Sequence, residues 1–147
     1  LMGIFNGAGR IMWASLSDYL TRPIVYVIFF ATQALAFYML PSIKEIVVFQ
    51  VVLYSIMTCY GGGFASIPAY IGDIFGTKEL GAIHGYILTA WAAAGLVGPL
   101  IISMVKDATG SYSQTLYVFA GFFVIAFIVS IAMIINIKSV QKQNKKH

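Results

Sequence analysis

The chain has 147 residues, of which 60% are hydrophobic and only 10% are charged, and its formal net charge is +4. A soluble domain carries about 25% charged residues, so this composition excludes a fully water-facing surface. The apolar residues lie in long uncharged blocks, as they do in proteins whose solvent is lipid. The single cysteine, Cys59, excludes an internal disulfide and any Cys-pair metal or redox site.

Charged residues mark the ends of the predicted membrane spans. A helix needs about 20 apolar residues to cross a hydrocarbon core of ~30 Å. We expect an all-α membrane protein with about five transmembrane helices, near 1–17, 23–41, 46–71, 81–105 and 114–137, and a basic tail at 138–147. Leu1 lies inside the first apolar block and no basic segment precedes it, so the block lacks the pattern of a signal peptide. We therefore expect the chain to continue a longer polytopic protein.

Basic residues between the spans predict the orientation. The tail carries Lys138, Lys142, Lys145 and Lys146. We therefore expect a multi-pass protein of the cell membrane, plasma or inner, with a cytoplasmic C-terminus. The loops at 18–22 and 72–80 are then cytoplasmic, and those at 42–45 and 106–113 face outward. We interpret the tail as a topology determinant near anionic headgroups, so the expected partner is the lipid bilayer and not a nucleic acid.

Arg10 lies inside the first predicted span, eight residues and therefore ~12 Å from Asp18 along a helix. An arginine near the bilayer centre costs ~2.5–3.5 kcal/mol on insertion scales, so such a residue faces a watery cavity or an acidic partner. Its guanidinium is a two-pronged donor that fits a carboxylate, which makes Arg10 a candidate anion site. Helical spacing predicts Asn6 and Trp13 on the same face. The alternative is a structural ion pair with an acid on another helix.

Trp91 is the second unusual residue. It lies ~15 Å along its helix from Gly81, deeper than the interfacial belts in which most membrane tryptophans sit. Tyr86 and Thr89 are close in the same stretch and can line the same space. We therefore place Tyr86, Thr89 and Trp91 among the candidate substrate-binding residues. The alternative is a tryptophan packed among alanines.

The segment ASLSDYLTR at 14–22 resembles the signature loop of the major facilitator superfamily, a Gly-x-x-x-Asp-basic-x-Gly-Arg pattern. Asp18 and Arg22 match this pattern, whereas its glycines and its middle basic residue are replaced. The resemblance implies that Asp18 and Arg22 form a conformational switch loop at the cytoplasmic hinge. The alternative is a pair of ordinary loop charges that set topology.

Three further segments are similar to the oxalate/formate antiporter branch of that superfamily: NGAGR at 6–10, YIGDIFG at 70–76 and HGYILTAW…GPL at 84–100. The resemblance covers nearly the whole chain and implies helices eight to twelve of a twelve-helix transporter. The chain would then form part of the C-terminal six-helix bundle, with the missing N-terminal half as its partner. In that branch an arginine in helix eight and a lysine in helix eleven bind oxalate. Arg10 matches the arginine, but Trp91 occupies the lysine's position.

One cation suits one carboxylate better than two. The resemblance therefore implies alternating-access transport of a small organic anion, with a monocarboxylate such as formate, lactate or pyruvate favoured over oxalate. The alternative is a membrane-embedded scaffold or assembly subunit without transport activity. An enzyme would need clustered His, Asp or Cys at membrane depth, and His84 and His147 cannot form such a cluster. We therefore expect no enzymatic activity, no cofactor and no metal.

Overall fold

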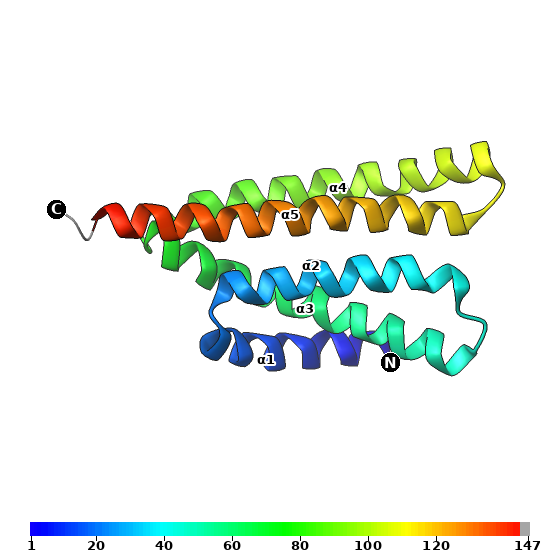
Figure 1. The fold of residues 1–147 in the computed structure, drawn as a ribbon, viewed down its shortest axis with the longest axis horizontal. Helices are drawn as coiled ribbons and strands as arrows, with labels where there is room; N and C mark the ends of the chain where they lie inside the picture. The colour runs from blue at the N-terminus through cyan, green and yellow to red at the C-terminus, as the bar shows by residue number, and fades with distance from the viewer. Residues whose placement is uncertain (145–147) are drawn as a thin grey trace.

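The computed structural model describes residues 1–144, and the side chains as far as residue 139. The elements in chain order are α1 (Met2–Leu20), α2 (Arg22–Met39), the 3-10 turn η1 (Leu40–Ser42), α3 (Ile46–Phe75), α4 (Leu80–Thr109) and α5 (Tyr112–Asn144). The prediction of an all-α fold is therefore confirmed over the described residues (Figure 1). The predicted tail at 138–147 begins within α5, and residues 145–147 lie outside the described part of the chain.

Four helices in the described part of the chain are long and apolar enough to cross a membrane. They are α2 together with η1, α3, α4 and the part of α5 up to Ser139. Consequently, the chain is a multi-pass membrane protein. The remaining helix, α1, carries the polar residues Asn6, Arg10 and Asp18 within its apolar sequence. It does not belong to this group. That α1 also spans the bilayer remains a prediction.

The turn between α1 and α2 is tighter than the sequence indicated. Asp18 and Arg22, predicted to lie in a loop, lie instead in the last turn of α1 and at the first residue of α2. Thr21 alone separates the helices, with φ at 69°, in a region that residues other than glycine rarely adopt. No glycine or proline interrupts 14–20, so α1 continues past Asp18. Pro23 then occupies the first turn of α2, where its missing N–H costs nothing.

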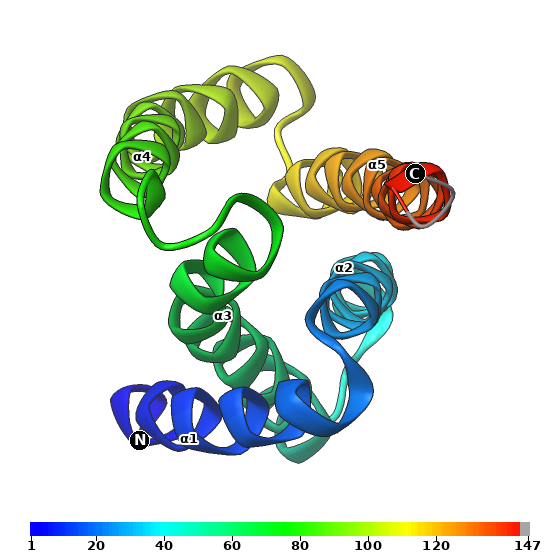
Figure 2. The ribbon, with the colours of Figure 1, turned by 90° about the vertical axis from the view of Figure 1, so that its left-hand side faces the viewer.

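Glycines bring α1 and α3 into close contact. Gly9 lies against the backbone of Thr58, and Gly61 lies against the backbone of Asn6, so neither position has room for a side chain. Close approach of this kind is how helices pack within membranes, where lipid is as apolar as leucine. Figure 2 shows α3 lying between α1 and α4, so that these three helices form one side of the bundle.

The described core lies between helices rather than at a single centre. Val25, Phe29 and Cys59 form one buried cluster, where α2 meets α3. A second cluster lies further along the same helices, around Ala36 and Ile56. By contrast, no residue of α4 is buried within the described chain. The faces of α4 are therefore available to something other than the described helices.

Candidate functional site

Contacts between α1 and α3 fix the level of Arg10 along the bundle. Gly9 packs against Thr58, and Trp13, one turn later, packs against Gly62. The chain reverses at each end of α2, so α1 and α3 run in the same direction (Figure 1). Arg10 follows Gly9 directly, and it therefore lies level with the part of α3 between Thr58 and Gly62.

The same contacts show that Arg10 lies beside the α1–α3 contact and not within it. Arg10 comes one residue after the contact residue Gly9, and each helical step turns the side-chain direction by roughly 100°. Tyr60 lies at the same level on α3 and faces α4, where it contacts Trp91.

Arg10 is exposed beside this contact. The ion pairs among the described residues all involve Arg22, so no described carboxylate neutralises Arg10. At its predicted membrane depth a guanidinium without a partner is costly. We therefore expect Arg10 to pair with a negative group from outside the described chain, either a bound anion or an acid on another segment.

Trp91 reaches the same level from α4. Its Nε1 donates a hydrogen bond to the hydroxyl of Tyr60 at 3.1 Å. Its ring meets the edge of Phe64 with 5.5 Å between centroids and 76° between planes. Trp91 remains 53% exposed and Tyr60 44% exposed. Trp91 is therefore level with Tyr60 on α3, and Arg10 is level with the same part of α3. The two predicted site residues, Arg10 and Trp91, thus lie at one level of the bundle.

Tyr60 was not singled out from the sequence. The chain contains nine tyrosines, and nothing local distinguishes this one. The available signal was its spacing of four from Phe64, which places two aromatic rings on one face of α3. The rings lie 6.2 Å apart in the structure. Its hydrogen-bond partner, Trp91 on α4, lies 31 residues away in sequence. The pairing could therefore not be predicted without the fold.

The other predicted binding residues on α1 pack against their neighbours. Trp13 lies against Gly62 and meets Phe29 edge-on, with 4.9 Å between centroids. Its indole Nε1 is buried and has no partner among the described residues. Asn6 is half-buried, with its backbone against Gly61. Trp13 thus contributes to the contact of α1 with α2 and α3, while Arg10 faces outward.

The predicted residues on α4 are open. Tyr86 is 78% exposed. Thr89 is exposed and its hydroxyl donates to the carbonyl of Gly85 in its own helix, at 3.0 Å. Neither residue contacts Arg10 through an interaction within the described chain. Their part in substrate binding remains a prediction.

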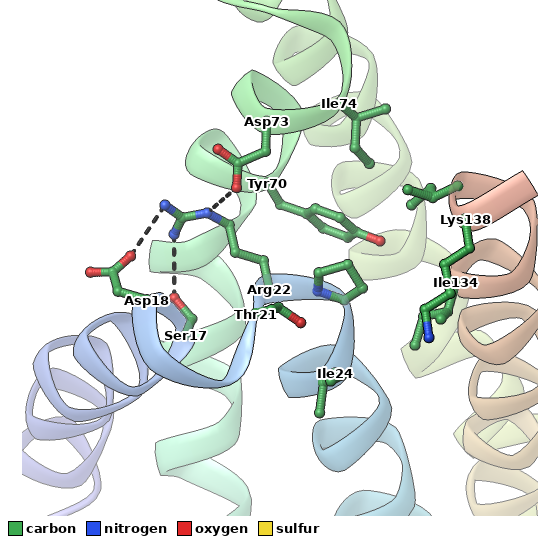
Figure 3. Close-up of a pocket in the computed structure, with 12 residues that line it drawn as sticks. Ser17, Asp18, Thr21, Arg22, Ile24, Tyr70, Asp73, Ile74, Ile134 and Lys138 are labelled. Carbon is green, nitrogen blue, oxygen red and sulfur yellow. Dashed lines mark hydrogen bonds and ion pairs between the residues drawn. The ribbon is translucent and has the colours of Figure 1, made fainter. Parts of the chain in front are cut away.

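A second polar group lies at the end of the bundle where α1 meets α2. Arg22 pairs with Asp18 through Nη2 at 3.2 Å and donates from Nε to Asp73 at 2.5 Å. Its Nη1 donates to the hydroxyl of Ser17 at 3.3 Å (Figure 3). We call these four residues the Arg22 cluster. The cluster ties the ends of α1, α2 and α3 together.

Asp73 extends the predicted switch pair of Asp18 and Arg22. It lies near the end of α3, 51 residues from Arg22 in sequence, so only the fold brings the two together. A cavity of about 430 Å³ adjoins the cluster, and Tyr70 and Lys138 also line it (Figure 3). Within the described part of the chain no group of His, Cys, Asp or Glu could hold a metal ion. The polar side chains of the Arg22 cluster line this cavity together with isoleucines such as Ile74 and Ile134.

Comparison with known proteins identifies relatives of this chain. The chain is 29% identical over 100 residues to the oxalate:formate antiporter of Oxalobacter formigenes, which covers 67% of this chain and 24% of the relative. It is 26% identical over 153 residues to monocarboxylate transporter 12-B of Danio rerio, covering 100% of this chain and 31% of the relative. It is 27% identical over 120 residues to human monocarboxylate transporter 10, covering 79% and 23%.

These matches span about a quarter to a third of the length of each relative. No solved structure matches the chain. The family model of the Major Facilitator Superfamily matches residues 1–147, which is the whole sequence. This agrees with the multi-pass helical fold and with the match of Asp18 and Arg22 to the signature pattern. The chain therefore belongs to the Major Facilitator Superfamily.

Proposed function

We propose that this chain is part of a longer transporter that carries a small organic anion across the membrane by alternating access. The observation that carries this proposal is Arg10, an exposed cation without a described acidic partner, level with Trp91 and Tyr60. A bidentate guanidinium is well matched to a carboxylate. The relatives support the substrate class, since their names refer to oxalate, formate and monocarboxylates.

A monocarboxylate is favoured over a dicarboxylate. Arg10 supplies one positive charge at this level, and Trp91 supplies an indole where the resemblance leads us to expect a lysine. A second carboxylate would meet a neutral aromatic group and lose its hydration without compensation, which is unfavourable for a charged group. Formate, lactate and pyruvate each present one carboxylate and fit this arrangement.

The Arg22 cluster supports the alternating-access mechanism. Its charges join three helix ends at the end of the bundle that we propose to be cytoplasmic, with the C-terminus on the same side. The pairing of Arg22 with Asp18 and Asp73 favours the conformation in which these ends are close. Loss of these pairs during transport would favour the opposite conformation. The missing N-terminal half completes the pathway, so this chain alone is not expected to transport.

The test is uptake by the full-length protein reconstituted in liposomes. Radiolabelled formate, L-lactate, pyruvate and oxalate are compared at equal concentration, with empty liposomes as the control. We expect saturable uptake of at least one monocarboxylate and weaker uptake of oxalate. Preference for oxalate over every monocarboxylate would contradict the proposed substrate class. Absence of uptake for all four would contradict organic anion transport.

A further inference from the structure

One face of α5 lines two adjoining cavities. The cavity beside the Arg22 cluster, of about 430 Å³, is lined on α5 by Ile134, Ile137 and Lys138. A second cavity, of about 320 Å³, is lined on α5 by Ala126, Ser130 and Met133. These residues recur at every third or fourth position, which places them on one side of the helix. Tyr70 and Ile74 of α3 belong to the walls of both cavities, so the two cavities lie end to end between α3 and α5.

Together the cavities are about as deep as one leaflet of a bilayer. Lys138 follows Ala126 by twelve residues on α5, which is ~18 Å along the helix. The hydrocarbon core of a bilayer is ~30 Å thick, so one leaflet contributes ~15 Å. The two cavities therefore extend from the end of the bundle, where Lys138 lies, to about the middle of the membrane.

The deeper cavity is apolar. Its wall also includes Phe30 of α2, Ile67 of α3 and Ile87 of α4. Tyr26 lines it too, but its hydroxyl donates to the carbonyl of Gly63 at 2.6 Å and is therefore already used. A small carboxylate would lose its hydration in such a cavity without compensation, whereas a hydrocarbon chain would lose none. The expected occupant of the deeper cavity is therefore a hydrocarbon chain.

The outer cavity offers a positive charge to a ligand. The ion pairs among the described residues all involve Arg22, which holds Asp18 and Asp73. Lys138 is exposed and pairs with no described carboxylate. In Figure 3 Lys138 lies across the cavity from the Arg22 cluster, and the hydroxyl of Tyr70 points toward the α5 side. An ammonium and a neutral hydroxyl donor thus line one cavity, and both can donate to an anionic oxygen.

We propose that the two cavities bind one anionic phospholipid, with its phosphate at Lys138 and Tyr70 and one acyl chain beside α5 as far as Ala126. Charge, apolar lining and depth together match this class of ligand, and basic pockets between transmembrane helices are suited to lipid headgroups. The site is separate from Arg10 and does not depend on the transported anion. It requires only that the bundle lies in a membrane.

The test measures binding of phosphatidylglycerol to the delipidated full-length protein in detergent, by native mass spectrometry. Lys138→Gln removes the charge and should raise the Kd of the tightest-bound lipid about tenfold or more, because hydrogen bonds to charged groups are strong. Lys44→Gln is the matched control, since this exposed lysine lies in the loop between η1 and α3, at the other end of α2. It should bind the lipid as wild type does. Tyr70→Phe should weaken binding at least about threefold.

The position of the acyl chain is tested with two chain lengths. The wild-type protein should bind dioleoyl phosphatidylglycerol more tightly than the dioctanoyl form, which is too short to reach Ala126. Ala126→Phe fills the deep end of the cavity and should remove this preference while leaving dioctanoyl binding unchanged. Val124→Phe adds the same ring on α5 in a different groove, and it should keep the preference. Equal affinity of wild type for the two lipids would overturn the assigned chain position without any substitution.

Three further results would overturn the proposal. One is wild-type affinity for phosphatidylglycerol in Lys138→Gln, or an equal loss in Lys44→Gln, which would mean general attraction to the basic surface. Another is equal affinity for phosphatidylcholine, whose positive choline group should make it the weaker ligand beside Lys138. The third is binding of oleate without binding of phosphatidylglycerol, since the ligand would then be a free fatty acid. None of these results would alter the proposed function, because that function depends on Arg10.

Discussion

The close contact between α1 and α3 supports the whole description of the site, and it can be tested by adding one methyl group. In Gly61→Ala the new Cβ would overlap the backbone of Asn6, which cannot rotate out of the way as a long side chain could. The two helices must separate to accommodate it. Overpacking of this kind costs about 1–3 kcal/mol. Because the contact also sets the position of Arg10, substrate affinity should fall together with stability.

The assay is the unfolding free energy of the full-length protein in mixed micelles, measured together with substrate binding. Gly7→Ala is the matched control, since Gly7 lies on α1 two residues before Gly9 and has open space around it within the described chain. We expect Gly7→Ala to remain within about 0.5 kcal/mol of wild type, as exposed substitutions usually do. A Gly61→Ala protein as stable as Gly7→Ala would refute the contact, and with it the assigned level of Arg10.

The remaining predictions concern specificity, topology and the switch. Trp91→Lys should shift preference toward dicarboxylates by adding a second cation near Arg10, and an unchanged preference in the folded variant would remove Trp91 from the site. A reporter fused after Lys146 should report cytoplasm and one inserted at Ser111 the exterior; detection of both on one side would contradict the proposed topology. Arg22→Gln should change the ratio of inward- to outward-facing protein by about fivefold, because partly exposed ion pairs contribute about 1 kcal/mol, and spectroscopic distance measurements that match wild type would contradict the switch.

The helices themselves could be predicted from the spacing of charges. Long uncharged blocks bounded by residues such as Lys44 and Lys106 can only be helical in lipid, because every backbone group must be satisfied within the segment. The helix ends were less accessible. The charges at Asp18 and Arg22 predicted a loop between two spans, but a helix can continue past a charged residue, and α1 continues past Asp18 to Leu20.

The candidate site was only partly predictable, because spacing along one helix gives direction but not neighbours. Arg10 was evident from its cost in lipid. Trp13 follows it by three residues, or roughly 300° of rotation, and this is enough to turn the indole toward Gly62 on α3. Tyr60 and Asp73 each acquire their role from a partner on another helix, at separations of 31 and 51 residues. No local pattern in the sequence carries that information.

The central claim is that Arg10 binds the substrate carboxylate, and the most direct measurement is substrate affinity in Arg10→Gln. Loss of a two-pronged contact with a charged group, at about 1.5–3 kcal/mol for each hydrogen bond, should weaken binding at least tenfold. Arg10→Lys keeps the charge and loses the planar fork, so it should be impaired less. A purely structural role predicts poor folding instead, and normalising binding to folded protein separates the two effects. Binding weakened at least tenfold in folded Arg10→Gln would support the account, and wild-type affinity in that variant would contradict it.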